Sequence, residues 1–245
     1  MYREQPVGPA LDRWAECVWS IESAEPIRGH AVRPDGCIDI LYSPAGLQAV
    51  GAMTSEQRYD LAPHARTVGL RFRPGMAAAF LRVDAAALTD RVIALQDLWG
   101  AAARDLSDRL DNASSLETVL AAAIRPPAPE PNPVQRAIEA VTSSHGDIDL
   151  DWVARQAGMS ERQFRRRCLQ ESGLSPKQLC RVLRFRRACG LGERGLPWGL
   201  IAAESGYFDQ AHLIRDFREF TGATPMRMTH ASVSVFSNTS PTRSG

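Results

Sequence analysis

The fold is decided by residues 158–173, GMSERQFRRRCLQESG, which predict a sharp turn followed by a short helix. The first glycine of this stretch permits the positive φ angle that a tight turn after a helix requires. Ser160 and Gln163 stand three residues apart and form a capping box, so the helix begins there. Phe164 and Cys168, four residues apart, give the helix a buried face, and the final glycine ends it.

The residues just before this turn predict a second helix that packs against the first. In residues 150–157, Val153, Ala154 and Ala157 face inward. The two helices and their turn therefore form a helix-turn-helix unit, whose second helix enters the major groove of DNA in proteins that use this motif. The outward residues of that helix, which form a compact basic surface, are Arg162, Arg165, Arg166 and Leu169. Each arginine taken singly is equally consistent with a solvated surface charge.

A second unit repeats this pattern in residues 197–222. Pro197 can begin a helix, and Asp209 can cap the next one after the turn at residues 205–208. Leu200, Ile201 and Ala203 lie on the first of these helices. On the second, Leu213 and Phe217 are expected to face inward, and Phe220 lies near the end. The residues expected to face outward are Gln210, Ala211, His212 and Arg215. Gln pairs with adenine, Arg with guanine, and a small apolar group contacts the thymine methyl.

A long helix over about residues 176–191 separates the two units. Leu179, Val182, Leu183 and Ala188 can bury one side of it, and arginines occupy the remainder. A rigid helix of this kind would hold two recognition helices in successive major grooves, roughly 34 Å apart. The alternative for the whole pattern is a plain helical bundle.

The chain divides at a proline-rich run. Residues 126–133 hold five prolines in eight positions and predict an extended spacer. We therefore expect a domain over 1–125, the spacer, an all-α domain over 134–230, and a flexible tail over 231–245 rich in Ser, Thr and Asn. The predicted fold class is α+β, with a β-rich first domain that also holds helices.

Short apolar runs predict strands in the first domain at Cys17–Ile21, Cys37–Tyr42 and Thr67–Phe72. Helical patterns follow near residues 76–81, 95–110 and 116–124. The second of these helices would align Leu95, Leu98, Trp99, Ala102, Leu106 and Leu110 on one side.

Charge is distributed unevenly along the chain, although the net charge is only +1. Residues 1–132 carry 13 Arg against 17 Asp or Glu, whereas residues 133–230 carry 15 Lys or Arg against 11 acids. This split suggests that the second part meets a polyanion. The five cysteines form no CxxC pair, which argues against a disulfide framework or a structural zinc site. The sequence shows no membrane span or signal peptide, so we expect a cytoplasmic protein with no membrane partner and no cofactor.

Residues 133–230 resemble the AraC/XylS family of bacterial transcription regulators. The strongest stretch is GYFDQAHLIRDFREFTGATP, residues 206–225, and the first unit matches at Ala154, Gly158, Ser160, Gly173 and Ser175-Pro176. The resemblance implies double-stranded DNA as a partner, with contacts from Arg162, Arg165, Arg166, Gln210, Ala211, His212, Arg215 and Arg218. Two residues depart from the family pattern: Ile214 stands where a small polar residue is common, and Ala211 offers no hydrogen bond.

The front of the chain is similar to an amino-terminal domain of some AraC-type regulators. The shared stretches are Pro34–Asp39 and Gly69–Gly75. The resemblance implies a small, cupin-like sheet followed by helices, which binds a small-molecule effector, forms a homodimer, or does both. It also implies RNA polymerase as a partner and a role as an activator.

Two interpretations of the first domain stay open. Arg33, Asp39 and Arg71, near strand ends, could hold a polar ligand, or Asp39 and Arg71 could form a structural salt bridge. A metal- or thiol-responsive site would instead use Cys17, His30 and Cys37. An enzyme is disfavoured because the sequence holds no GxSxG, Walker, HExxH or dinucleotide motif, and no catalytic residues are assigned.

Overall fold

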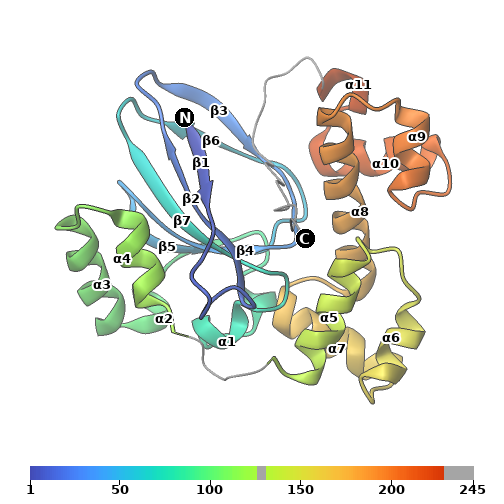
Figure 1. The fold of residues 1–245 in the computed structure, drawn as a ribbon, viewed down its shortest axis with the longest axis horizontal. Helices are drawn as coiled ribbons and strands as arrows, with labels where there is room; N and C mark the ends of the chain where they lie inside the picture. Colours follow the sequence, from blue (N-terminus) through green and yellow to red (C-terminus); the bar gives the residue numbers. More distant parts are fainter. Residues whose placement is uncertain (126–130, 229–245) are drawn as a thin grey trace, which may run out of the picture.

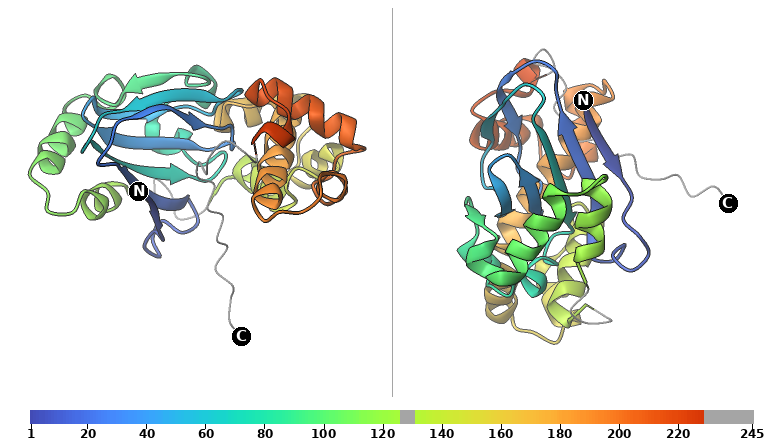
Figure 2. Two further views of the ribbon diagram at one scale, coloured as in Figure 1. Left: turned by 90° about the horizontal axis from the view of Figure 1, so that it is seen from above. Right: turned by 90° about the vertical axis from the view of Figure 1, so that its left-hand side faces the viewer.

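In a computed structural model of the chain, residues 1–125 and 131–228 are described, and the elements lie in two adjoining parts (Figure 1). The strands and the first helices form one part, and the later helices form the other (Figure 2). The predicted tail over 231–245 lies outside the described residues, as does most of the predicted spacer.

The first part is built on a six-stranded antiparallel sheet with the strand order β1-β2-β7-β4-β5-β8. Its strands are β1 (Tyr2–Gln5), β2 (Ala15–Glu22), β4 (Ile38–Ser43), β5 (Gly46–Val50), β7 (Arg66–Phe72) and β8 (Val92–Ala94). A separate two-stranded ribbon pairs β3 (Ile27–Val32) with β6 (Gln57–Leu61). The three predicted strands lie within β2, β4 and β7. The sheet confirms the β-rich first domain.

The two faces of the sheet have different surroundings because successive side chains of a strand point to opposite faces. One face, which includes Val18, Ile40 and Leu70, is fully buried in the main core with the helices. The helices are α1 (Ala78–Leu81), the 3-10 turn η1 (Ala85–Ala87), α2 (Gln96–Trp99), α3 (Ala101–Asp111) and α4 (Leu116–Ala123). The other face carries Trp19 and Leu41 in a smaller apolar cluster to which Leu61 of the β3–β6 ribbon also belongs.

The single helix predicted over residues 95–110 is wrong, because the segment is divided between α2 and α3. Gly100 separates them with φ +57° and ψ −124°, a conformation that a residue with a Cβ rarely adopts. The rotation at this break buries Ala103, whereas Ala102, expected on the apolar side, is exposed.

The second part is all helical, as predicted. Its helices are α5 (Pro133–Ser143), α6 (Leu150–Gln156), α7 (Glu161–Ser172), α8 (Pro176–Glu193), α9 (Trp198–Glu204), α10 (Gln210–Thr221) and α11 (Pro225–Met228). Asn132 and Gln135 form a capping box at the start of α5, so Pro133 is the first residue of this helix. Among the described residues, no helix is both long and apolar enough to cross a membrane.

The two parts share one hydrophobic core, which runs from the strands through α8 to α10. The helix α7 lies against η1 and α1 of the first part. Gly75 comes so close to α5 that a Cβ there would lie 2.7 Å from Ile138 Cδ1. The first part therefore supports the helical part directly, through packed side chains.

Candidate nucleic-acid interface and ligand cavity

The first helix-turn-helix unit forms as its local sequence predicts. Gly158 takes φ +66° in the turn between α6 and α7. The Gln163 backbone N–H donates to Ser160 Oγ at 3.3 Å, and the Ser160 N–H donates to Gln163 Oε1 at 2.9 Å. Phe164 and Cys168 are buried on the inner face of α7. These contacts fix the direction in which the outer face of α7 points.

The outer face of α7 is a surface of unpaired positive charge. Arg162, Arg165 and Arg166 are exposed, and among the ion pairs of the described residues none uses them. The sequence interpretation missed Arg167, which is exposed on the same helix. Arginines without carboxylate partners are available for phosphates and for guanine edges.

The second unit has the same construction. Gly206 takes φ +73° in the turn, and Asp209 caps α10 by accepting a hydrogen bond from the His212 N–H at 2.6 Å. Tyr207 is buried in the turn, and its ring lies edge-on to the His212 ring at 5.1 Å. His212 is therefore half-buried, and part of its ring surface is already in contact with protein.

The outer face of α10 is more apolar and less charged than that of α7. The exposed residues that were predicted to contact DNA are Gln210, Ala211, Arg215 and Arg218. Phe208, just before the cap, is 94% exposed, and the sequence interpretation did not assign it a role in DNA contact. An exposed phenyl ring beside a recognition helix is a candidate for contact with base methyl groups or sugars.

The buried face of α9 is formed by Ile201 and Ala202. Leu200 and Ala203 of the same helix are exposed. The ring of Trp198 packs edge-on against Phe217 at 5.4 Å. Ile201 and Ala202, three and four residues later on the same side of the helix, therefore face the core.

The long helix α8 is tied to α10 by Arg181. Its Nη2 donates to Asp216 Oδ1 at 2.8 Å, and its Nη1 donates to Glu219 Oε1 at 2.9 Å. Asp216 is almost fully buried, so this contact lies at the join of the two helices. Arg181 therefore holds the second recognition helix in place and is not a free cation for DNA.

A second arginine of α8 ties the helical part to the sheet. The Arg186 Nη2 donates to Glu16 Oε2 at 2.7 Å and its Nη1 donates to Glu16 Oε1 at 3.0 Å. The Arg186 guanidinium also contacts Cys37 Sγ at 3.7 Å. Burial raises the pKa of Glu16, but the charge and hydrogen bonds of Arg186, together with the charges of Arg71 and Arg73, bring it below its ordinary value. This bidentate ion pair is therefore an internal contact between the two parts.

Further polar contacts join the two recognition helices to the first part. Thr89 Oγ1 donates to the Gly173 carbonyl at the end of α7, at 2.7 Å. The Glu56 N–H donates to the Phe220 carbonyl of α10, at 2.6 Å. Both recognition helices therefore have a hydrogen-bonded partner in the amino-terminal part.

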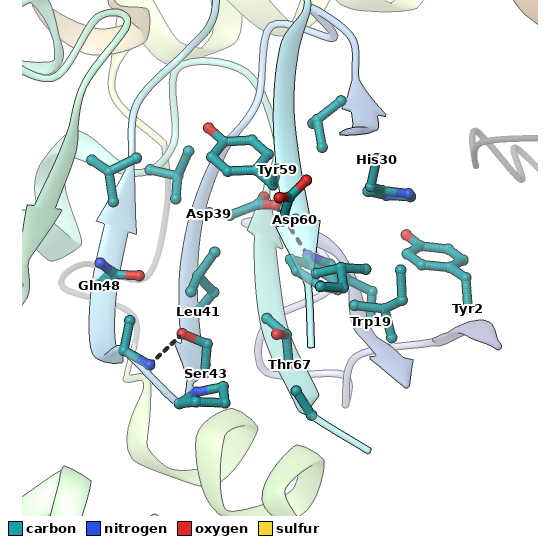
Figure 3. Close-up of a pocket in the computed structure, with 18 of the residues that line it drawn as sticks. Tyr2, Trp19, His30, Asp39, Leu41, Ser43, Gln48, Tyr59, Asp60 and Thr67 are labelled. Atoms are coloured by element: carbon teal, nitrogen blue, oxygen red, sulfur yellow. Dashed lines mark hydrogen bonds between the residues drawn. The ribbon is translucent and has the colours of Figure 1, made fainter. Parts of the chain in front are cut away.

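A cavity of about 570 Å³ lies between the sheet and the β3–β6 ribbon (Figure 3). Apolar and aromatic side chains form much of its wall, including Tyr2, Trp19, Ile21, Leu41, Tyr59 and Leu61. A cavity of this size can hold a small organic molecule.

The three predicted ligand residues, Arg33, Asp39 and Arg71, all line this cavity. Arg71 Nε lies 3.5 Å from Asp39 Oδ1, so the salt-bridge interpretation also holds, and the pair forms part of the cavity wall. Trp19 crosses to β4 and donates from Nε1 to Asp39 Oδ2 at 3.0 Å. The glycine on the strand between them, Gly69, makes room for the indole, because a Cβ there would lie 2.3 Å from Trp19 Cε2.

Burial changes the titration of these groups. It raises the pKa of Asp39 to about 6, although the charge of Arg71 opposes the shift. The nearby carboxylates, first of all Asp39, hold the pKa of Arg71 well above its ordinary value despite its burial. Burial also lowers the pKa of His30, which lines the same cavity, and so favours its neutral form.

The predicted metal or thiol set does not form a site. Among the described residues, no group of three or more His, Cys, Asp and Glu side chains could hold a metal ion, and this includes Cys17, His30 and Cys37. All five cysteines are buried and free. Burial raises the pKa of the Cys37 thiol well above its ordinary value, which makes it a poor metal ligand and a poor nucleophile.

Comparison with known proteins identifies both parts. The family described as "Helix-turn-helix domain" matches residues 153–231, and the family described as "Domain of unknown function (DUF6597)" matches residues 3–94. No curated protein matches the chain.

Solved structures of similar proteins include a DNA-binding transcriptional dual regulator from Escherichia coli K-12. It is 26% identical with a TM-score of 0.36, and the match covers 42% of this chain and 94% of that one. The DNA-binding domain of AdpA, in complex with a target DNA, is 24% identical with a TM-score of 0.39, over 41% and 93% of the two chains. ToxT from Vibrio cholerae O395 is 10% identical with a TM-score of 0.43, over 89% and 97%.

The helical domain thus has two capped helix-turn-helix units, exposed cations on the first recognition helix, and the match over residues 153–231. The chain therefore carries an AraC-type helix-turn-helix domain over residues 153–231, preceded by a DUF6597 domain over residues 3–94.

Proposed function

We propose that α7 and α10 read a promoter operator together, in successive major grooves of double-stranded DNA in the cytoplasm. The observation that carries this proposal is the unpaired cationic face of α7, Arg162, Arg165 and Arg166, on a helix whose start is fixed by a capping box. Exposed arginines at this half of a recognition helix can form forked contacts to guanine, while other cations grip phosphates.

The second recognition helix contributes fewer groups that can distinguish bases. Gln210 and Arg215 are exposed and offer hydrogen bonds, whereas Ala211 offers only a methyl group. Arg218, nearer the end of α10, suits a phosphate. We propose that this helix positions the protein and reads fewer base pairs than α7.

We also propose that the amino-terminal cavity binds a small-molecule effector. Its size and its mixture of apolar walls with buried charges at one end support this role. Arg33 of the cavity wall lies 4.0 Å from Glu193 of α8, measured from Nη1 to Oε1. Occupation of the cavity can therefore alter the contacts of the helix that joins the two recognition helices.

The remaining partners are proposed on the family resemblance alone. They are RNA polymerase, with the protein as an activator, and a second copy of the chain as a homodimer. Two copies on paired half-sites would bind more tightly through effective concentration.

The DNA proposal is tested with Arg165→Ala. The variant should weaken operator binding by about 1–3 kcal/mol and relax the preference at one base position. Arg104→Ala is a matched control, because Arg104 is also an exposed arginine, on α3 of the other domain. Equal binding losses in the two variants, or none in Arg165→Ala, would show that the outer face of α7 does not read bases.

A further inference from the structure

The two arginines that line the cavity, Arg33 and Arg71, are each flanked by carboxylates. Arg71 lies within 3.6 Å of Glu4, Asp35 and Asp39, and its closest separation is 3.4 Å to Asp35 Oδ2. Arg33 lies 3.6 Å from Glu56 through its Nε. In this cluster the carboxylates outnumber the guanidinium groups, so the ion pairs do not cancel its charge.

The excess of carboxylates over guanidinium groups persists when every further ion pair of these side chains in the described residues is counted. Glu193 is a second partner of Arg33, and Arg58 at the surface is a second partner of Glu56. Five carboxylates thus stand against three guanidiniums. Glu16 and Arg186 nearby neutralise each other. The cavity wall itself carries Asp39 and Asp60 against Arg33 and Arg71, and the other carboxylates lie behind these two arginines. They offset the positive charge that Arg33 and Arg71 would otherwise present to a ligand.

Aromatic rings stand beside the acidic end of the cavity. Tyr2 and Trp19 are stacked, with ring centres 6.1 Å apart, and Tyr59 of the ribbon lines the cavity as well (Figure 3). The negative faces of such rings attract organic cations. Asp39 Oδ1, Arg71 Nε and Arg33 Nε are buried without a hydrogen-bond partner, although Arg71 Nε lies 3.5 Å from Asp39 Oδ1. An ammonium group in the cavity would donate the hydrogen bond that Asp39 Oδ1 lacks.

We propose that the cavity takes an organic cation, an amine or amidine with an apolar or aromatic body, whose charge is balanced by the carboxylate of Asp39. The apolar body would lie along Leu41, Ile21 and Leu61, and the charged group would lie at the end formed by Asp39 and Trp19. An anionic ligand would instead have to displace carboxylates from Arg71 or Arg33, each of which already has at least two acidic neighbours. The inference rests on the proposed effector role of this cavity.

The charge preference can be measured with three probes of one shape: tryptamine, tryptophol and indoleacetate. Isothermal titration calorimetry on the full chain would give their affinities, since it does not depend on indole absorbance. We expect tryptamine to bind at least about tenfold more tightly than tryptophol, because a charge-assisted contact replaces a neutral one. Indoleacetate should bind more weakly than either.

Two variants test whether Asp39 is the source of the preference for tryptamine. In Asp39→Asn, tryptamine should lose its advantage over tryptophol, while the amide oxygen can still accept the Trp19 hydrogen bond and keep the wall intact. Asp60→Asn is the matched control, because Asp60 lines the same cavity but is exposed and paired with Arg28 at 2.7 Å. This control should keep most of the preference for tryptamine. Circular dichroism would confirm that both variants fold.

A preference for indoleacetate, equal binding of all three probes, binding of none of them, or a tryptamine preference that survives Asp39→Asn would overturn the inference. Operator affinity is measured on the same samples with and without tryptamine. If tryptamine binds through Asp39 and operator affinity does not change, the cation site stands and the effector role fails.

Discussion

The buried ion pair between Glu16 and Arg186 gives the sharpest test of how the two parts are joined. The substitution Arg186→Met keeps the apolar stem of the side chain and removes its charge. Glu16 then stays in the interface without its two hydrogen bonds at 2.7 and 3.0 Å. The two side chains are only 12% and 18% exposed, so water cannot replace the lost partner well.

Removal of one partner of a buried pair costs about 3–5 kcal/mol, because the remaining charge is left without compensation. This is a large fraction of the 5–15 kcal/mol that typically separates a folded domain from its unfolded state. The matched control is Arg187→Met on the next position of α8. Arg187 lies 3.8 Å from Glu204 and both side chains are partly exposed, so its loss should cost at most about 1 kcal/mol.

The pH dependence gives a second readout of the same pair. The folded-state pKa of Glu16 lies below its ordinary value of 4.5, so its stabilising contribution is present above that pH and is lost as the pH falls through the lowered value. In Arg186→Met the same carboxyl is buried without its cation, which raises its pKa. The variant should therefore recover part of its lost stability between pH 7 and pH 5, relative to the unsubstituted protein.

Urea denaturation at both pH values, followed by circular dichroism, measures these free energies of unfolding. We expect one cooperative transition for the full chain and a much lower midpoint for Arg186→Met at pH 7. If Arg186→Met is no more damaging than Arg187→Met, the buried pair does not join the two parts as argued here.

Three further predictions follow from the cavity and the shared core. Gly69→Ala should destabilise the protein by about 1–3 kcal/mol and change its near-ultraviolet circular dichroism, because a Cβ 2.3 Å from Trp19 Cε2 displaces the indole. The control Gly190→Ala, with open space around it, should cause neither change. The raised pKa of Asp39 favours the protonated folded state, so the unsubstituted protein should lose about 3 kcal/mol of stability as the pH rises from about 4 to 6. Asp39→Asn should not show this loss. Thermal melts at several pH values that show the same fall in both proteins would contradict this. A fragment of residues 133–228 should be less stable in urea than the same helices in the full chain, because it exposes the apolar surface that they bury in the common core; equal midpoints would show that the domains are independent.

The helix-turn-helix units could be predicted closely from the sequence because their signals are local. Ser160 with Gln163, the glycine turns and Asp209 each act within a few residues, and all of them form the predicted caps. The sequence did not indicate which face of α9 is buried, because the packing of Trp198 against Phe217 depends on a residue nearly twenty positions away.

The first domain was less predictable. The strands β3 and β6 carry mostly half-buried or exposed residues, since they cover a cavity, and they lack the alternating pattern of a strand on a filled core. Arg33, Asp39 and Arg71 were nevertheless selected from their positions near strand ends, and all three line the cavity. Their aromatic neighbour Trp19 was missed, because its contact with Asp39 crosses an intervening strand.

The contacts between the two parts could not be predicted at all. A proline-rich spacer suggests separate domains, whereas Glu16 and Arg186, 170 residues apart in the sequence, meet in a buried pair. Pairing over such a separation leaves no local pattern in the sequence. The spacer composition describes only the covalent connection between the parts.

The central claim is that both recognition helices read DNA as one rigid unit. Selection of bound sequences from a random pool of double-stranded DNA, at roughly 150 mM salt to suppress non-specific binding, tests it most directly. We expect an enriched motif with two contact blocks about ten base pairs apart, the stronger block belonging to α7 and weakened by Arg165→Ala. A motif with one block, two blocks at variable spacing, or no enrichment would contradict it.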